Sequence, residues 1–310
     1  MKSLIIKVMM CTVLLVVVAC GKREGVIVKK YKIDEVMAFE KHYYNDALFH
    51  SVDSYVEEDW HWDGKEMYRI DYRSDHPYSE NFFYGSHGRL ERTTVPAYGI
   101  SSEFHYDGRM LEHIDFYQDE KPLMTVSVVH GEKKIEEIDC QYYNLDTNAV
   151  VKCCNPLASL LGNEVASNLE KENAQRRLEQ HKRGVKSLNM RYVLSWSDDN
   201  VTAIKCIDAD GTRNIAISYD DKNNPYNQLY GYRELSDPLF GFEMLSENNI
   251  LTIRMPYQRN KNQLFTYRYE YDGKCPTRRT LTYSYPTISV TTLDSVMFRY
   301  EKVETFVYVD

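Results

Sequence analysis

The sequence lacks most of the short motifs that indicate a catalytic, metal-binding or phosphate-binding site. It has no C-x-x-C pair, so neither a zinc ribbon nor a thioredoxin-type redox site has support. It also has no G-x-S-x-G, no H-x-x-x-H, no H-E-x-x-H and no glycine-rich phosphate loop. We therefore predict no catalytic residue and no cofactor, and an enzyme activity has no sequence signature here.

Basic residues are the second shortage. The chain has 38 Lys and Arg against 46 Asp and Glu, for a formal net charge of −8. A surface without excess positive charge releases few counterions from a phosphate backbone. We therefore predict no nucleic-acid partner.

Long apolar runs are absent except at the start of the chain. Lys2 and Lys7 give a short positive region, and residues 8–18 are almost wholly apolar. This run is too short for a membrane span, which takes about 20 apolar residues. Residues 1–19 are therefore predicted to be a signal peptide, and its removal takes the formal charge from −8 to −10 because two lysines leave.

The signal ends in the sequence Val-Val-Ala-Cys-Gly at positions 17–21. This segment resembles the lipobox of bacterial lipoproteins, in which the cysteine becomes the acylated N-terminus. The resemblance implies that Cys20 carries the lipid and that residues 20–32 form a tether between the membrane and the fold. The alternative is an ordinary cysteine beside an ordinary signal peptide. Several acyl chains on one residue would hold the protein on a membrane essentially permanently.

Cysteines are too few and too irregular to define a disulfide framework. Apart from Cys11 and Cys20, the chain has five of them: Cys140, Cys153, Cys154, Cys206 and Cys275. An odd number leaves at least one thiol unpaired. The adjacent pair is poorly placed to bond to itself, so we expect a bridge from Cys153 or Cys154 to Cys140 across a hairpin.

Glycine and proline are scarce, with 14 and 9 residues, whereas tyrosine is abundant, with 26. Tyrosine suits strands that are packed on one face and wet on the other. A repeated unit uses it: a short alternating strand ends in an aromatic residue, enters a turn of Asp, Asn, Gly or Lys, and restarts as another strand. Instances lie at 60–65, 82–90, 104–110, 194–201, 217–223, 244–250 and 269–274.

Each unit has the form of a β-hairpin, because such turns tolerate the positive φ that tight hairpins require. We therefore predict an all-β fold, an extended antiparallel meander of repeated hairpins over 33–155 and 185–310, with a single curved sheet as one way to arrange it. An open sheet of this kind has edge strands, which favours dimerisation or addition of a partner's strand.

One segment between the two halves differs. Residues 156–184 have no proline after the first position, many good helix formers and a narrow leucine stripe that fades after Leu169. We predict a helical insert, as one helix or as two broken near Gly162, packed on the sheet. A coiled-coil partner site is the alternative.

These hairpins, with their aromatic-Asp-x-x-Gly or Asn turns, resemble YD or Rhs-type repeats. Together with the lipobox they are similar to the uncharacterised β-rich lipoproteins of Bacteroidetes-type bacteria. The resemblance covers about residues 50–145 and 190–285, and it implies export and an antiparallel sheet but brings no catalytic residues. It also implies the outer membrane. The residues after the cysteine, at 21–24, are mainly basic rather than acidic, so the periplasmic and surface faces both stay open.

Acidic turns and histidines raise the question of a metal. The Asp-Ala-Asp-Gly segment at 208–211 places its glycine too early for an EF-hand loop, and turn chemistry explains it. Eight of nine histidines lie between His42 and His130, but none has metal-ligand spacing within one element. The sequence therefore predicts no metal site.

Aromatic residues are the feature that suggests binding. Six of them recur at the same place in the unit: Trp60, Trp62, Tyr106, Trp196, Tyr219 and Tyr271. On a regular sheet they would form a ladder. If the ladder faces solvent, it can stack on sugar rings or on an aromatic-rich peptide. If it faces inward, it forms the core through cross-strand pairs.

The sequence thus predicts an envelope lipoprotein, a non-enzymatic binding or structural module whose partner is a glycan or an envelope protein. The alternative is an envelope glycan hydrolase whose carboxylates meet only in three dimensions. A transmembrane barrel is disfavoured, because the mean hydropathy is −0.54 and charged residues occupy both strand faces, as in 298–305.

Overall fold

The chain divides into two compact units, Met1–Lys30 and Tyr31–Asp310, and the structure, a computed structural model, describes residues of the second. The described stretches are 32–64, 66–73, 77–86, 88–132, 134–143, 188–208, 211–228, 241–257, 261–288 and 295–309. Three predicted features lie outside them: the signal peptide 1–19, the lipidation site Cys20 and the helical insert 156–184.

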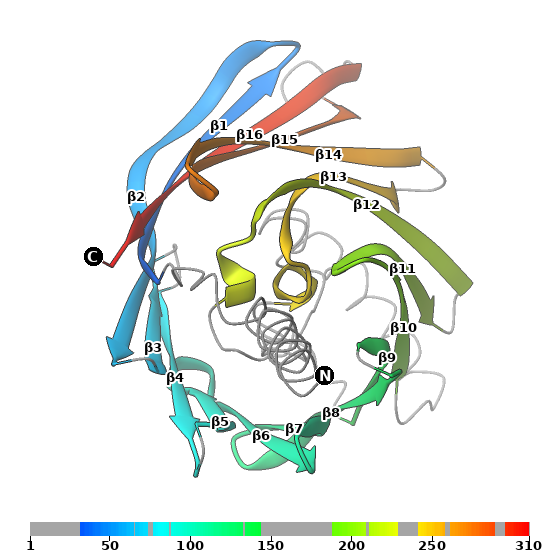
Figure 1. Ribbon diagram of the computed structural model, residues 1–310. Helices are drawn as coiled ribbons and strands as arrows, with labels where there is room; N and C mark the ends of the chain where they lie inside the picture. The colour runs from blue at the N-terminus through cyan, green and yellow to red at the C-terminus, as the bar shows by residue number, and fades with distance from the viewer. Residues whose placement is uncertain are drawn as a thin grey trace, which may run out of the picture. The chain divides into compact units, whose positions relative to one another are not determined.

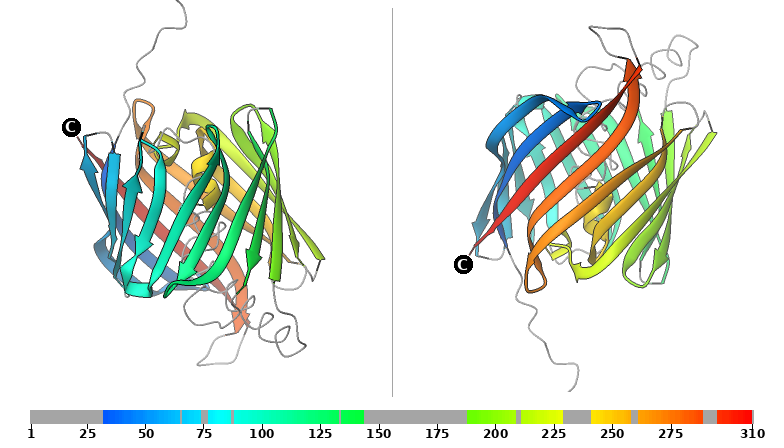
Figure 2. Two further views of the ribbon diagram at one scale, coloured as in Figure 1. Left: turned by 90° about the horizontal axis from the view of Figure 1, so that it is seen from below. Right: turned by 90° about the horizontal axis from the view of Figure 1, so that it is seen from above.

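Sixteen antiparallel strands form one closed barrel in which each strand pairs with its neighbours in the chain (Figure 1). The strands are β1 Ile33–Tyr44, β2 Ala47–Asp63, β3 Glu66–Tyr72, β4 Tyr78–Tyr84, β5 Leu90–Val95, β6 Ile100–Asp107, β7 Met110–Gln118, β8 Lys121–His130, β9 Ile135–Tyr142, β10 Leu188–Ser197, β11 Asn200–Asp208, β12 Gly211–Asn223, β13 Asn248–Tyr257, β14 Lys261–Asp272, β15 Cys275–Ile288 and β16 Ser295–Tyr308. The strands run obliquely around the wall (Figure 2). The prediction of an all-β meander is confirmed.

The expectation of an open curved sheet is wrong. β1 pairs with β16 from Ile33 opposite Tyr308 to Tyr44 opposite Phe298, and this pairing closes the barrel. Local turns specify which strands are neighbours, but closure depends on the register between the two ends of the chain, which no turn encodes. Among the described strands no edge is left open, so the expected edge pairing with another chain loses its basis.

The turns have the predicted chemistry. Asn45 and Asp46, between β1 and β2, both have positive φ, at 46° and 65°, as the tight hairpin turn with a right-handed twist requires. Gly108 and Gly273 each follow Asp in an Asp-Gly turn and have φ of 56° and 61°. A Cβ at either position would be strained by the backbone conformation.

The inner face of the barrel is apolar and aromatic. On β16, Phe298, Tyr300 and Phe306 are buried, whereas Arg299 and Glu301 alternate with them and are only partly buried. Buried side chains from strands all around the barrel belong to one hydrophobic cluster, so the core lies on the inner face. The alternation therefore sorts residues into an inner and an outer face.

The outer face carries charge along the strands. Outward positions include Glu103, Asp115, Asp139, Arg191, Arg254, Arg268 and Glu301. Charged residues at mid-strand are typical of a surface in contact with water.

Two short 3-10 helices follow β12 and precede β13. They are η2, Tyr226–Gln228, and η3, Gly241–Leu245, and both lie inside the ring of strands in Figure 1. Phe242 of η3 meets Tyr192 of β10 with ring centroids 5.3 Å apart, and Tyr226 meets Phe306 at 6.0 Å. A third 3-10 turn, η1 Pro96–Tyr98, joins β5 to β6.

In the described part of the chain, no helix has the length and apolar character needed to cross a membrane.

Candidate functional site

The repeated aromatic residues have a common structural role at one rim of the barrel. The ring of Trp62, near the end of β2, donates from Nε1 to the carbonyl of Ile33 at the start of β1, over 2.7 Å. Tyr106, near the end of β6, donates in the same way to the carbonyl of Leu90 at the start of β5, over 2.8 Å. Each bond joins the two strands of a hairpin at the end opposite their turn.

All eight odd-even strand pairs carry such a bond, which we call a rim bond. The eight donor and acceptor pairs are Trp62 and Ile33, Tyr84 and Met67, Tyr106 and Leu90, His130 and Leu111, Trp196 and Ile135, Tyr219 and Val201, Tyr269 and Ile250, and Tyr308 and Pro276. The repeat therefore encodes an inward aromatic body with a polar tip that satisfies a backbone carbonyl.

The predicted aromatic ladder lies mostly within this rim. Trp62, Tyr106, Trp196 and Tyr219 are rim donors that pack partly buried against the core. The ladder therefore faces the interior, where cross-strand packing was expected for an inward-facing row.

The other two ladder residues lie deeper or beside the rim. Trp60 is 2% exposed and donates from Nε1 to Glu58 over 3.1 Å. Tyr271 donates its hydroxyl to Asp220. The polar atoms of these rings are already hydrogen-bonded within the fold. A ligand is therefore expected to contact the faces of the rings rather than their edges.

A group of charged side chains interrupts this aromatic interior. We call it the interior ion cluster, and its members are Glu57, Glu58, Glu243, Arg279, Lys302 and Glu304. They come from β2, η3, β15 and β16. β2 and β15 lie on either side of the β1–β16 pair that closes the barrel. Chain segments more than 200 positions apart therefore meet in one site.

Arg279 is the centre of one half of the cluster. Its Nε and Nη2 donate to the two oxygens of Glu304, with 3.0 Å for the Nη2 bond, and its Nη1 donates to Glu243. The guanidinium also lies 5.5 to 5.7 Å from the ring centroids of Tyr226, Tyr267 and Phe306. Bidentate pairing and aromatic contact are what an arginine can offer and a lysine cannot.

Lys302 is the centre of the other half. Its Nζ lies 2.6 Å from Glu57 and 3.0 Å from Glu304. Glu304 therefore accepts from both cations, and its carboxylate joins the two halves.

A β-bulge explains how two consecutive glutamates reach the same interior. Val36 pairs with Glu58 while Met37 pairs with Val56, so Glu57 is an extra residue in β2. Glu58 shares the inner face with the buried Val36, and the bulge turns Glu57 inward as well. Without the bulge, successive strand residues would point to opposite faces.

The cluster contains four carboxyls and two cations, and the pKa values reflect that imbalance. Burial raises the pKa of Glu58 to about 8, with repulsion from Glu57 and Glu304 adding to the effect. Burial also raises the pKa of Glu57 and of Glu243. Burial opposes ionisation of Glu304 too, but Arg279 and Lys302 lower its pKa to about 2.

Two carboxyls with pKa values so far apart are the arrangement from which an acid and a base can be made. In this cluster the ionised member, Glu304, is bound through both oxygens to Arg279 and also to Lys302. A carboxylate held in this way is a poor nucleophile or base. Glu57 and Glu58 are the carboxyls with more capacity to meet a ligand.

Sequence reasoning missed the cluster, although part of it was visible. Lys302 and Glu304 occupy the same alternating positions as Tyr300 and Phe306, which marks them as inward charges. Arg279 likewise shares the inward alternating positions of β15 with Leu281 and Tyr283. The bulge at Glu57 leaves no comparable signal.

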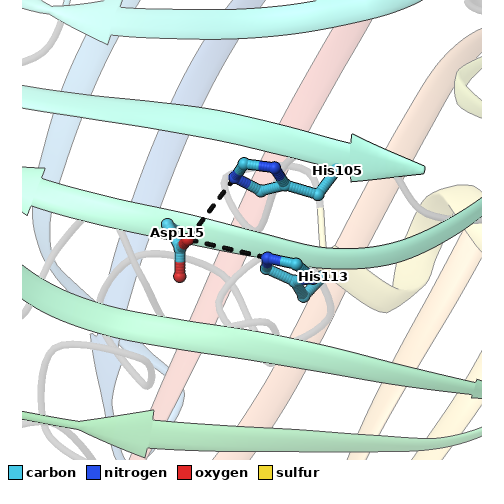
Figure 3. Close-up of side chains that lie close together, drawn as sticks. All are labelled: His105, His113 and Asp115. Atoms are coloured by element: carbon cyan, nitrogen blue, oxygen red, sulfur yellow. Dashed lines mark ion pairs between the residues drawn. The ribbon is translucent and has the colours of Figure 1, made fainter.

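Within the described stretches, two other groups offer metal-ligand atoms, and both lie on the outer face. They are His105, His113 and Asp115 (Figure 3), and Asp59, His61 and Asp71. Neither group follows a spacing within one strand, because each combines residues of neighbouring strands.

The cysteines differ from expectation. Cys140, Cys206 and Cys275 are free and buried, so the expected bridge to Cys140 is not present. Burial raises the pKa of the Cys140 and Cys206 thiols to about 12. Such thiols are inert rather than catalytic. Cys153 and Cys154 lie outside the described residues.

No protein-family model matches this chain, and no curated protein matches it.

Proposed function

We propose that the chain is a non-enzymatic lipoprotein of the cell envelope whose barrel binds an amphipathic molecule with a cationic head. The N-terminal lipobox supports the anchor. The charged outer face supports a barrel that stands in water, and the aromatic interior with its ion cluster supports a ligand that enters the barrel.

The observation that carries the proposal is the excess of carboxyls at the bulge. Carboxyls in the interior are costly unless a positive group or hydrogen-bond donors compensate them. Lys302 compensates Glu57 in part, whereas Glu58 has a pKa of about 8 and accepts from Trp60. A cationic head group placed beside Glu57 and Glu58 would favour the ionised form of these carboxyls and pair with it, while its apolar body packs on aromatic rings.

Three probes of equal chain length test this proposal: dodecylamine, dodecanol and dodecanoate. Titration calorimetry on the purified full chain, below the concentration at which the probes form micelles, is expected to show the amine binding at least about tenfold more tightly than the alcohol, equivalent to about 1.4 kcal/mol. Dodecanoate is expected to bind most weakly. Equal affinities, or a preference for dodecanoate, would refute a cationic ligand.

A glycan hydrolase is the second candidate, and the raised pKa of Glu58 is the observation in its favour. A general acid needs such a pKa, and a partner carboxylate must be free to act. Glu304 is not free. Release of new reducing ends from purified envelope glycans, abolished by Glu58→Gln, would establish the hydrolase and overturn the non-enzymatic proposal.

The proposed location is the outer membrane, anchored through Cys20. Metabolic labelling with a palmitate analogue is expected to mark the native chain and not Cys20→Ala. Protease treatment of intact cells then distinguishes the two faces. Loss of the protein would place it on the surface and favour an extracellular glycan or protein partner, and protection until lysis would place it in the periplasm.

A further inference from the structure

His105, His113 and Asp115 lie together on the outer face of the barrel (Figure 3). His105 on β6 is the direct cross-strand partner of His113 on β7. Asp115 follows His113 by two residues, so both point from the same side of β7. The hairpin register, and not a spacing within one strand, thus brings two imidazoles and a carboxylate to one point.

The donor atoms stand at the separation of metal ligands. The Nε2 atoms of His105 and His113 lie 3.4 Å and 3.6 Å from Oδ2 of Asp115. Two ligands of a tetrahedral Zn²⁺, with bonds of about 2.0 to 2.1 Å, are about 3.4 Å apart. The two imidazole rings are stacked, with centroids 4.2 Å apart and planes 13° from parallel. Because a metal ion lies in the plane of each imidazole that binds it, the rings must tilt out of this stack to bind one ion.

The ligand atoms also have free capacity. Nε2 of His105 is shielded from solvent and has no hydrogen-bond partner. The hydroxyl of Thr125 donates to Oδ1 of Asp115 over 2.5 Å, which leaves Oδ2 turned toward the histidines. Nδ1 of His113 lies 3.6 Å from Glu112, and a carboxylate near the far nitrogen of a histidine is a frequent outer-shell partner of metal ligands.

The second outer group lacks this capacity, although its residue types are similar. Asp71 binds Nε of Arg69 at 2.7 Å and the hydroxyl of Ser79 at 2.5 Å, and Asp59 binds Arg73 at 2.7 Å. Guanidinium groups there take the carboxylate oxygens and repel a further cation. In the stretches that the structure describes, Asp115 pairs with no lysine or arginine.

We propose that His105, His113 and Asp115 form a surface site for a divalent transition metal, with Zn²⁺ as the best match. Imidazole ligands favour such ions over Mg²⁺ and Ca²⁺, which prefer all-oxygen sites. Three protein ligands leave a fourth position open to water or to a group from a partner. This site is independent of the proposed ligand inside the barrel.

Titration of the full chain with ZnCl₂ tests the proposal, on protein purified without a histidine tag and stripped of metal by chelation. We expect one equivalent of Zn²⁺ to bind at micromolar protein, and a hundredfold excess of Mg²⁺ not to displace it. His113→Gln and Asp115→Asn are each expected to weaken binding at least tenfold. Thr125→Val removes only the hydroxyl that donates to Asp115 and is expected to weaken Zn²⁺ binding about tenfold.

His61→Gln in the other outer group is the matched control and is expected to bind Zn²⁺ as the native chain does. Thermal midpoints show that the variants remain folded. The proposal is overturned if the native chain binds no Zn²⁺, if binding survives in His105→Gln/His113→Gln, or if His61→Gln abolishes it.

Discussion

Two walls of the same barrel differ in the side chains that they bury. The far wall, which we define as the inner faces of β7, β8 and β9, buries only hydrophobic side chains, among them Ile114, Leu123 and Ile138. The closure wall, the inner faces of β15, β16, β1 and β2, buries Arg279 and Lys302 with their glutamates among aromatic rings. Both walls carry rim bonds, so the hairpin repeat itself is the same on each side.

The far wall shows that buried charge is not needed to build the wall of this barrel. Replacing a buried ion pair by well-packed hydrophobic residues is often neutral or stabilising, so such a pair is weak evidence for a stabilising role. The closure wall therefore retains charge for another reason, which we take to be ligand binding. A role in fixing the register between β1 and β16 would also place charge on these strands. The experiments below separate this role from ligand binding.

The largest effect is expected from Arg279→Met. Loss of the guanidinium leaves Glu243 and Glu304 without their partner in the interior, so the free energy of unfolding should fall by about 3 to 5 kcal/mol. Denaturant unfolding measures it. Arg278→Met is the matched control, because Arg278 lies on the outer face and pairs with an exposed Glu270 at 3.3 Å. Its loss should cost less than about 1 kcal/mol, and equal costs would contradict the account.

The next effect is expected on the far wall. Ile114 is 0% exposed, and Ile114→Ala should cost about 3 kcal/mol through lost burial and the cavity left behind. The same unfolding experiment gives the value. Glu112→Ala, two residues away and exposed, should change stability by less than about 0.5 kcal/mol. A cost for Ile114→Ala below 1 kcal/mol would show that the far wall is not a packed core.

A smaller effect is expected at the rim. Tyr106→Phe keeps the ring and removes the 2.8 Å bond to the carbonyl of Leu90, for a loss of about 1 kcal/mol. Tyr68→Phe removes a hydroxyl from a ring that is 47% exposed and should be near neutral. If both substitutions are neutral, the rim bonds do not contribute to stability and the repeat needs another explanation.

The smallest effect at pH 6 is expected from Glu58→Gln, because the native side chain is already largely protonated there. Its pKa of about 8 lies above the ordinary 4.5, so the folded state binds this proton more tightly than the unfolded state. The contribution of Glu58 to stability is therefore full below pH 4.5 and is lost as the pH rises toward 8.

Thermal midpoints between pH 5 and pH 9 measure this dependence. Glu58→Gln should flatten the decline, and the exposed Glu112→Gln should not. Parallel curves for the native chain and Glu58→Gln would show that the carboxyl of Glu58 is not buried in the way described.

The local fold could be predicted from the sequence, whereas its closure could not. Asp107-Gly108 and Asp272-Gly273 specify hairpins by their φ requirement, and an aromatic residue before each turn marks the inner face. The pairing of β1 with β16 joins residues such as Ile33 and Tyr308 from the two ends of the chain. No local pattern carries that register, so an open sheet and a barrel were equally compatible with the hairpins.

The sites show the same limit. Lys302 and Glu304 were visible as charges at aromatic positions of one strand, but their partner Glu57 depends on a bulge. His105 and His113 become neighbours only when the hairpin between them is placed in register. A search for metal-ligand spacing within one element passes over a pair of this kind.

The most direct test of the account measures amine binding by the double variant Glu57→Gln/Glu58→Gln. We expect its affinity for dodecylamine to fall at least tenfold, while its affinity for dodecanol stays unchanged and its stability falls by less than that of Arg279→Met. Glu136→Gln/Glu137→Gln, a consecutive pair on β9 whose side chains are exposed or only partly buried, is the matched control and should bind as the native chain does. Unchanged amine binding by the Glu57→Gln/Glu58→Gln chain would contradict the account and leave the closure of the barrel as the role of the cluster.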